Sequence, residues 1–161
     1  MKLAHFDPEI DTNSQFDSVD LGELIAAEVE TYYTVARSKN IELSLDARPA
    51  TVRGGHYGLS VLVRNLMDNA IRYTSDGGRV LLSCKSGDSG TELSVQDSGV
   101  GISMSDREKV FDRFFRAADN TTLGSGLGLA IVKQIAERHG ADILIEDGLN
   151  GSGVSFVVKF T

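Results

Sequence analysis

Glycines crowd the start of a helical pattern near the end of the chain. Gly124, Gly126 and Gly128 lie in "NTTLGSGLGLAIVKQIAERHG", and the apolar residues that follow recur at helical spacing. A helix N-terminus attracts anions through its unpaired N–H groups and its dipole, and glycines leave room there for a phosphate group. The spacing is neither that of a P-loop nor that of a dinucleotide-binding turn. The stretch therefore predicts a phosphate site of another kind.

Amide side chains border the apolar face of a second helix, predicted over residues 56–73. Asn65 and Asn69 lie one turn apart, and Arg72 and Tyr73 follow on the same flank. An amide oxygen suits Mg²⁺, a guanidinium suits phosphate oxygens, and an aromatic ring suits a flat base. Asn is a poor residue for a helix interior, so the pair needs a reason. The pattern is equally compatible with two Asn side chains that face solvent or cap a neighbouring loop.

An acidic residue ends the apolar side of a strand predicted over residues 91–97. Leu93, Val95 and Asp97 share one parity, so Asp97 is expected to point towards the core. A buried carboxylate needs a partner, and the amino group of a ligand supplies one. Gly99 and Gly101 would let the backbone approach that ligand closely. A plain Asp-Ser-Gly turn would give the same letters.

Phenylalanines and arginines cluster in "EKVFDRFFRAADN", residues 108–120. Phe111, Phe114 and Phe115 precede a polar loop, which predicts a hydrophobic anchor for a movable segment. An arginine at its edge, Arg113 or Arg116, is then placed to reach a phosphate when the segment closes. An amphipathic surface helix whose phenylalanines lie in the core is the alternative.

The elements that position these residues follow from hydrophobic periodicity. Asp20 is expected to cap a helix that runs to about residue 39, and a capping box predicts a short helix from Ser105. The pattern predicts helices on one face of a largely antiparallel sheet. The remaining predicted elements are strands at 41–47, 79–85, 91–97, 141–147 and 153–161 and helices at 56–73 and 126–139.

Composition narrows the function classes. The chain has 161 residues, 41% of them hydrophobic, which predicts one domain with a real core. A net charge of -7 argues against a nucleic-acid surface. We find no apolar run long enough for a bilayer and no signal peptide. Cys84 is the single cysteine, which excludes a disulfide framework and favours a small strand residue. His139 is interpreted as a structural residue at a helix end.

Four segments occur together in a characteristic order. "NLMDNAIRYT", "DSGVGI", "FDRFFR" and "GSGLGLAIVK" match the N, G1, F and G2 boxes of the GHKL ATPase/kinase superfamily. The chain resembles the catalytic and ATP-binding domain of bacterial sensor histidine kinases over about residues 20–161. Residues 1–19 are then a linker or fragment edge. The resemblance implies the Bergerat fold: an α/β (α+β) two-layer sandwich, with a mixed, mostly antiparallel sheet covered on one face by helices, and an ATP lid.

The resemblance also implies roles for the residues of the N and F boxes. Asn69 is the expected Mg²⁺ ligand, and Asn65 assists it and takes part in catalysis. Arg72 stands where the family often has Lys and is expected to contact phosphate. Tyr73 is expected to pack on adenine or ribose, and Arg116 of the lid is expected to reach the terminal phosphate as a catalytic residue.

The glycine boxes carry the remaining expected ATP contacts. Asp97 is expected to accept a hydrogen bond from the adenine amino group, and Gly99 and Gly101 to shape the adenine pocket. Ser155 is expected to touch adenine through water. The expected phosphate cradle comprises Gly124, Gly126, Leu127 and Gly128.

The function implied is transfer of the ATP γ-phosphate to a histidine. None of His5, His56 and His139 lies in the family's phosphoacceptor pattern, so the acceptor is expected on a separate dimerisation domain of the same receptor. The chain is expected to be inactive without that domain and monomeric as a fragment. It would be a cytoplasmic part of an inner-membrane receptor, with no nucleic-acid or membrane contact of its own and a response regulator as an indirect partner.

Two other classes share this fold. ATP-hydrolysing clamps, as in type II topoisomerases, mismatch-repair proteins and the related chaperones, usually carry a Glu four residues before the Mg²⁺-binding Asn. That position here is Asn65, whose amide cannot take a proton at pH 7. A non-catalytic nucleotide-binding module would be expected to have lost some box residues, and none of the main ones is lost. The phenylalanine-rich lid argues against an anti-sigma serine kinase.

Overall fold

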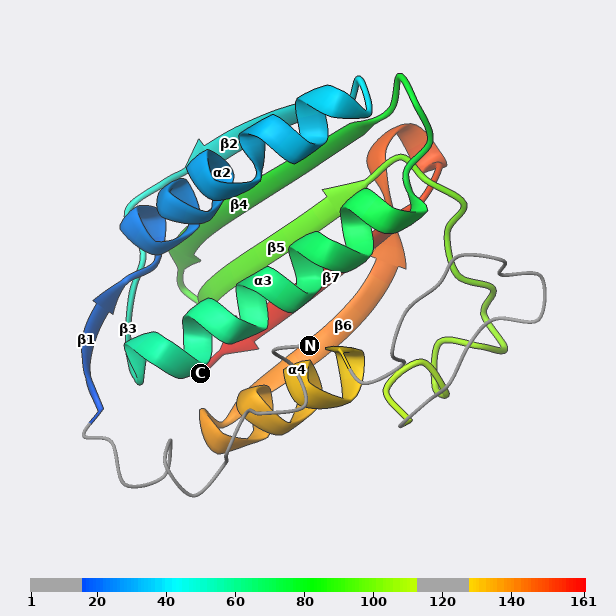
Figure 1. The fold of residues 1–161 in the computed structure, drawn as a ribbon. Helices are drawn as coiled ribbons and strands as arrows, with labels where there is room; N and C mark the ends of the chain where they lie inside the picture. The colour runs from blue at the N-terminus through cyan, green and yellow to red at the C-terminus, as the bar shows by residue number, and fades with distance from the viewer. Residues whose placement is uncertain (1–15, 113–127) are drawn as a thin grey trace.

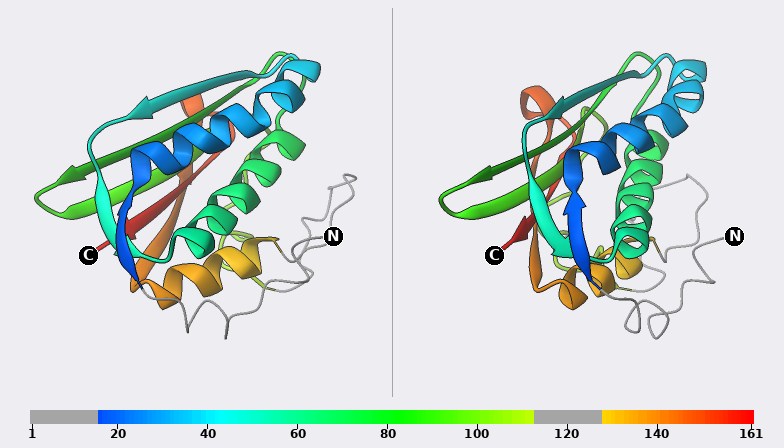
Figure 2. Two further views of the ribbon diagram at one scale, coloured as in Figure 1. Left: turned by 60° about the vertical axis from the view of Figure 1, so that its left-hand side comes forward. Right: turned by 90° about the vertical axis from the view of Figure 1, so that its left-hand side faces the viewer.

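The computed structural model describes residues 16–112 and 128–161. Its main sheet has five strands in the order β2-β4-β5-β7-β6. Helices α2, α3 and α4 all lie on one face of this sheet (Figures 1 and 2). The predicted two-layer sandwich is therefore confirmed. The strands are β2 (Glu42–Ala47), β4 (Arg79–Gly87), β5 (Gly90–Asp97), β6 (Ala141–Asp147) and β7 (Val154–Phe160), and the helices are α2 (Leu21–Ser38), α3 (His56–Tyr73) and α4 (Gly128–Arg138).

The sheet is mixed but mostly antiparallel. β2 pairs in parallel with β4, whereas the β4–β5, β5–β7 and β6–β7 pairs are antiparallel. Parity decides which side chains enter the core, because successive residues of a strand face opposite sides. Val80, Leu82 and Cys84 of β4 are buried against the helices, as are Leu93 and Val95 of β5. Cys84 is thus the small strand residue that the sequence predicted.

Two short strands were not predicted. β1 (Asp17–Asp20) and β3 (Thr51–Gly54) form a separate two-stranded antiparallel sheet, in which Val19 lies opposite Val52 and both are buried. Four residues are too few for a clear alternating pattern. The predicted cap of α2 is confirmed, since Asp20 Oδ1 accepts a hydrogen bond from the Glu23 N–H at 3.2 Å.

The helix predicted from Ser105 is wrong over the described residues. The chain after β5 forms successive turns, in which the N–H of Asp106 donates to Ser103 and that of Val110 donates to Asp106. The capping-box pattern is a local signal, and tertiary contacts of the same segment override it. The start predicted for the last helix, at residue 126, lies outside the described residues. Gly140 follows that helix with φ 64°, the left-handed conformation predicted for it.

Within the described ranges, none of the helices has the length and apolar character that a membrane crossing requires.

Candidate active site

Asp97 is a deeply buried ionisable residue of the predicted site. It ends β5 on the helix side of the sheet and is only 2% exposed. Its Oδ1 accepts hydrogen bonds from the backbone N–H of Gly99 at 2.9 Å and of Val154 at 3.2 Å. Burial raises the pKa of the Asp97 carboxyl, and these two hydrogen bonds oppose the rise. Across residues 16–112 and 128–161 no group donates to Oδ2, which leaves one carboxylate oxygen for a ligand.

Glycines surround Asp97 because the backbones there approach too closely for side chains. A Cβ at Gly99 would clash with the carbonyl oxygen of Tyr73. A Cβ at Gly153 would lie 2.5 Å from Asp97 Oδ1, and Gly101 has φ 75° with the Gly153 carbonyl beside it. The structure therefore brings Gly99 and Gly101 to Asp97, as predicted, and adds Gly153. Gly153 had no role of its own among the predictions from the sequence.

Asn65 and Asn69 lie one turn apart on α3. Asn65 is 2% exposed, and its Nδ2 donates to the Val61 carbonyl at 2.8 Å. Its Oδ1 is buried and finds no hydrogen-bond partner among the described residues. Asn69 is half-buried and likewise bonds to none of them. The alternative in which both amides face solvent is therefore wrong, and the buried acceptor calls for a bound water or ligand.

The other predicted site residues that the structure describes lie at the end of α3 and at the start of α4. Arg72 is exposed near the end of α3 and makes no ion pair with the residues described, and Tyr73 beside it is half-buried. Gly128 is the first residue of α4, a helix that packs against α3 (Figure 1). Arg116, Gly124, Gly126 and Leu127 lie outside the described residues.

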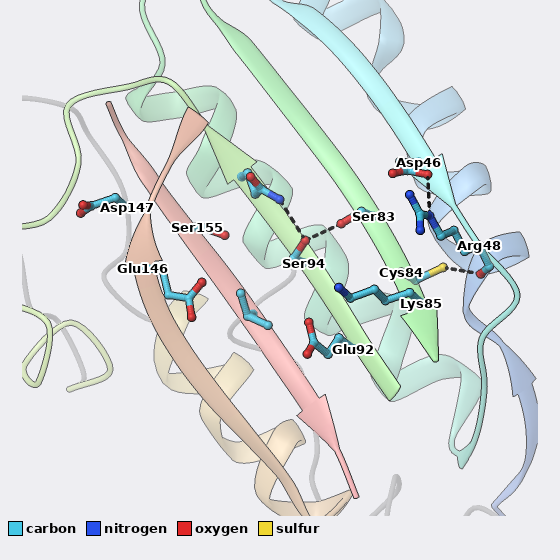
Figure 3. Close-up of a pocket in the computed structure, with 12 residues that line it drawn as sticks. Asp46, Arg48, Ser83, Cys84, Lys85, Glu92, Ser94, Glu146, Asp147 and Ser155 are labelled. Carbon is cyan, nitrogen blue, oxygen red and sulfur yellow. Dashed lines mark hydrogen bonds and ion pairs between the residues drawn. The ribbon is translucent and has the colours of Figure 1, made fainter. Parts of the chain in front are cut away.

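Ser155 is not in the site. It lies opposite Gln96 in the β5–β7 register, whereas Asp97 has the opposite parity and faces the helices. Its side chain lines a groove of about 280 Å³ on the outer face of the sheet, together with Ser94 and Glu146 (Figure 3). The predicted water-mediated contact between Ser155 and adenine is therefore wrong. Val154, one residue earlier, supplies the backbone N–H that reaches Asp97.

The segment after the Asp97 turn is fastened to the sheet at two points. The Phe111 ring meets the buried Phe156 ring edge-to-face at 6.3 Å, which confirms the predicted anchor for Phe111. Phe114 and Phe115 lie outside the described residues. Arg107, which the sequence did not single out, donates to the Ile145 carbonyl at 3.3 Å and to Asp147 Oδ1 at 2.9 Å. Arg107 therefore holds segment 102–112 to β6, and Phe111 packs the same segment against β7.

Comparison with known proteins identifies this arrangement. Residues 54–161 match the family described as histidine kinase-, DNA gyrase B-, and HSP90-like ATPase. The chain belongs to this family. Within it, the fold and the relatives are those of histidine kinases, so the chain is an ATP-binding domain of the histidine kinase type.

Individual relatives agree with this assignment. The chain is 31% identical over 160 residues to the swarming motility regulation sensor protein RssA of Serratia marcescens, covering 98% of this chain and 34% of RssA. It is 41% identical over 138 residues to the histidine-protein kinase/phosphatase MprB of Mycobacterium ulcerans, covering 84% of this chain and 26% of MprB. The solved mycobacterial sensor histidine kinase MprB superposes with a TM-score of 0.78 at 36% identity, covering 88% of this chain and 95% of that one. The chain thus spans about a third or less of these curated relatives.

Proposed function

We propose that this histidine kinase domain binds Mg-ATP between the Asp97 turn and helices α3 and α4, and transfers the γ-phosphate to a histidine on a separate phosphoacceptor domain. The Asp97 carboxylate is the observation that carries the proposal. A buried acidic group with one oxygen already bonded to backbone and the other unpaired among the described residues matches the exocyclic amino group of adenine. Guanine presents a carbonyl oxygen at that position, which a carboxylate would repel.

Asn69 and Asn65 are the proposed ligands of Mg²⁺. The fit rests on the unpaired buried Oδ1 of Asn65 and on the unbonded amide of Asn69 one turn later. Neutral amide oxygens suit a hard cation that keeps its remaining contacts to waters and phosphate oxygens. Among residues 16–112 and 128–161 no cluster of three His, Cys, Asp or Glu side chains is suited to a metal. When bound, the ion would neutralise phosphate charge.

The residue types favour transfer over hydrolysis. Asn65 occupies the position from which a Glu would activate water in the ATP-hydrolysing clamps, and its amide cannot accept a proton. In the proposed reaction a nitrogen of the acceptor imidazole forms a bond to the γ-phosphorus as the bond to the β-bridging oxygen breaks, and ADP leaves. Arg72 and Arg116 are proposed to contact the phosphates, Tyr73 to pack on adenine or ribose, and Gly128 to close the phosphate cradle formed with Gly124, Gly126 and Leu127.

The acceptor is proposed to belong to the same receptor. RssA is named as a sensor protein and MprB as a histidine-protein kinase/phosphatase, and both are three to four times as long as the matched segment, since the chain covers 34% and 26% of them. We propose that this domain works as the cytoplasmic catalytic part of such a receptor, with residues 1–19 as the linker and a response regulator as the final phosphate acceptor.

Phosphotransfer to a separate domain tests the proposal. The chain is mixed with Mg-ATP and a purified helical-hairpin phosphoacceptor domain, and acid-labile phosphate is followed on the hairpin. We expect transfer with ATP, little with GTP, and none to a hairpin whose histidine is replaced by Gln. ATP hydrolysis at the same rate with and without the hairpin, and no label on it, would instead assign the chain to the clamp ATPases.

A further inference from the structure

The His139 imidazole joins the end of α4 to the start of α3. Its Nδ1 lies 2.8 Å from the Ile135 carbonyl, and its Nε2 accepts a hydrogen bond from the Gly55 N–H at 3.1 Å. A carbonyl only accepts and a backbone N–H only donates, so both contacts are satisfied by a neutral ring with its proton on Nδ1. The Ile135 contact is local to α4, whereas the Gly55 contact connects two helices that are distant in sequence.

The His139 imidazole is closely packed by two other segments of the chain. A Cβ at Gly54 would lie 2.8 Å from His139 Cδ2 and 2.9 Å from Nε2, so the β3 backbone approaches the imidazole more closely than any side chain permits. On another side, the Phe16 ring stacks on the imidazole at 4.7 Å with an interplanar angle of 13°. Phe16 directly precedes β1, so the N-terminal part of the chain meets His139 where α4 ends.

This junction joins the C-terminal end of α4 to the start of α3. Val132 and Ile135 of α4 are fully buried, and α4 packs against α3 and β6, so the His139 contact adds a directional hydrogen bond at one end of that packing. The helix has 11 residues and is therefore about 16 Å long at 1.5 Å per residue, so a tilt of about 5° about its C-terminal end moves Gly128 by about 1.4 Å. Displacements of that size matter where a phosphate must meet helix N–H groups.

We propose that His139 is a positioning residue for the ATP phosphates: by accepting from the Gly55 N–H it holds α4 against α3, with Phe16 fixing the ring. The inference rests on the proposed nucleotide function, because α4 begins at the predicted phosphate cradle. It assigns no contact between His139 and the ligand.

Two substitutions separate the contacts of the ring. In His139→Gln the side-chain oxygen replaces Nε2 as the acceptor for Gly55. In His139→Asn the amide replaces Nδ1 and leaves the Gly55 N–H without a partner.

Calorimetry with a non-hydrolysable ATP analogue and with adenosine provides the readout. We expect His139→Asn to weaken binding of the ATP analogue by roughly three- to tenfold, as for the loss of one hydrogen bond. Adenosine, which has no phosphates, should bind all variants alike, and His139→Gln should restore most of the affinity for the ATP analogue.

Further variants and controls guard against a merely structural effect. Gly54→Ala presses on the ring, and also on Leu59 of α3, so it should weaken binding of the ATP analogue at least as much as His139→Asn does. Glu137→Gln on the exposed side of the same helix end should match wild type. Phe16→Ala should weaken binding of the ATP analogue in wild type but add little in His139→Asn. Thermal unfolding confirms that each variant is folded at the assay temperature.

The outcomes distinguish this proposal from the proposed function. If wild type binds the ATP analogue and His139→Asn binds it equally well, the positioning role is wrong while nucleotide binding stands. Equal losses for adenosine and for the analogue, or no recovery in His139→Gln, would reduce His139 to a residue of general stability and also overturn the proposal. If wild type binds neither ligand, the proposed function itself fails.

Discussion

Asp97→Asn isolates the proposed adenine contact with a change of one atom. The substituted side chain keeps an oxygen that can accept from Gly99 and Val154, so the backbone around the turn retains its hydrogen bonds. The second carboxylate oxygen becomes an NH₂ group, which donates. The adenine amino group also donates, so the substitution replaces an attractive contact by one between two donors.

The loss of affinity follows from the type of hydrogen bond. A hydrogen bond to a charged acceptor contributes about 1.5–3 kcal/mol, and a neutral one about 1 kcal/mol. Removing the charged acceptor is therefore expected to cost about 1–3 kcal/mol, which raises the Kd for ATP by about 5- to 150-fold. Because a donor replaces it, we expect the upper half of that range.

Stability should change in the opposite direction and with pH. Burial raises the pKa of Asp97 in the folded state, so its ionisation costs folding free energy. The contribution of Asp97 is most favourable below the unfolded pKa of about 3.9 and is lost as pH rises through the higher folded pKa. The Asn side chain does not ionise. The free energy of unfolding of Asp97→Asn relative to wild type should therefore increase as pH rises from about 3.5 towards neutral.

Calorimetry and urea unfolding provide the two measurements. Calorimetry gives the Kd for ATP and GTP, and unfolding between about pH 3.5 and pH 7 gives the stability difference. Glu92→Gln makes the same chemical change on β5 but on the outer face of the sheet, and should leave ATP affinity unchanged. An unchanged Kd for ATP in Asp97→Asn, or wild-type affinity for GTP equal to that for ATP, would refute the adenine assignment. A stability difference that is flat with pH would refute the role given to burial.

Three other expectations concern the metal, the thiol and the α2–α3 interface. Asn69→Ala should remove the strengthening of ATP binding by Mg²⁺ and abolish phosphotransfer, and titrations with Mg²⁺ or with EDTA check this; a retained Mg²⁺ effect would transfer the role to Asn65. Cys84 is 2% exposed, and burial raises the pKa of its thiol, so a thiol reagent at neutral pH should modify it only as fast as the chain unfolds. In the wild type the buried Glu28 carboxylate lies 3.2 Å from Arg64 Nε. Arg64→Ala leaves that carboxylate without its cation, so we expect it to lower the free energy of unfolding by about 1–3 kcal/mol, measured by urea titration. Adding Glu28→Gln should restore most of that loss, and a loss that persists would mean the ion pair is not its cause.

The parity of one strand was enough to place Asp97. Leu93 and Val95 define the buried side of β5, and Asp97 follows at the same period, so its burial was predictable before its partners were known. The adenine contact predicted for Ser155 is wrong for a related reason. Side chains alternate along a strand, so a shift of one residue moves a side chain from one face of the sheet to the other. The group that does meet Asp97 from β7 is a backbone N–H, which any residue except proline provides. A contact made by a backbone N–H therefore cannot be predicted from the residue type at that position.

Contacts between segments that are distant in the chain also could not be predicted from the sequence. The helix predicted from Ser105 rested on a local capping pattern, whereas Arg107 in the same stretch reaches out to Ile145 and Asp147 of β6. His139 was predicted to be structural, and its contacts confirm this, but its partner Gly55 lies 84 positions away. Local propensity cannot report such a pairing, because it depends on how α3 and α4 meet.

The two ends of the proposed nucleotide site differ in how their geometry is fixed. Around Asp97 the fixing groups are backbone atoms of β5, β7 and the glycine turns, packed so closely that a Cβ at Gly99 or Gly153 would clash. That end is rigid because the sheet itself supports it. The phosphate end begins at Gly128, on a helix that packs against α3 and whose C-terminal end is joined to the start of α3 by the His139 imidazole. A change in the N-terminal segment that moved Phe16 would therefore alter the phosphate end while leaving the adenine end intact. An effect confined to the phosphate end acts on the affinity for ATP and on group transfer but not on adenosine binding, because the phosphates supply both binding contacts and the reacting atoms.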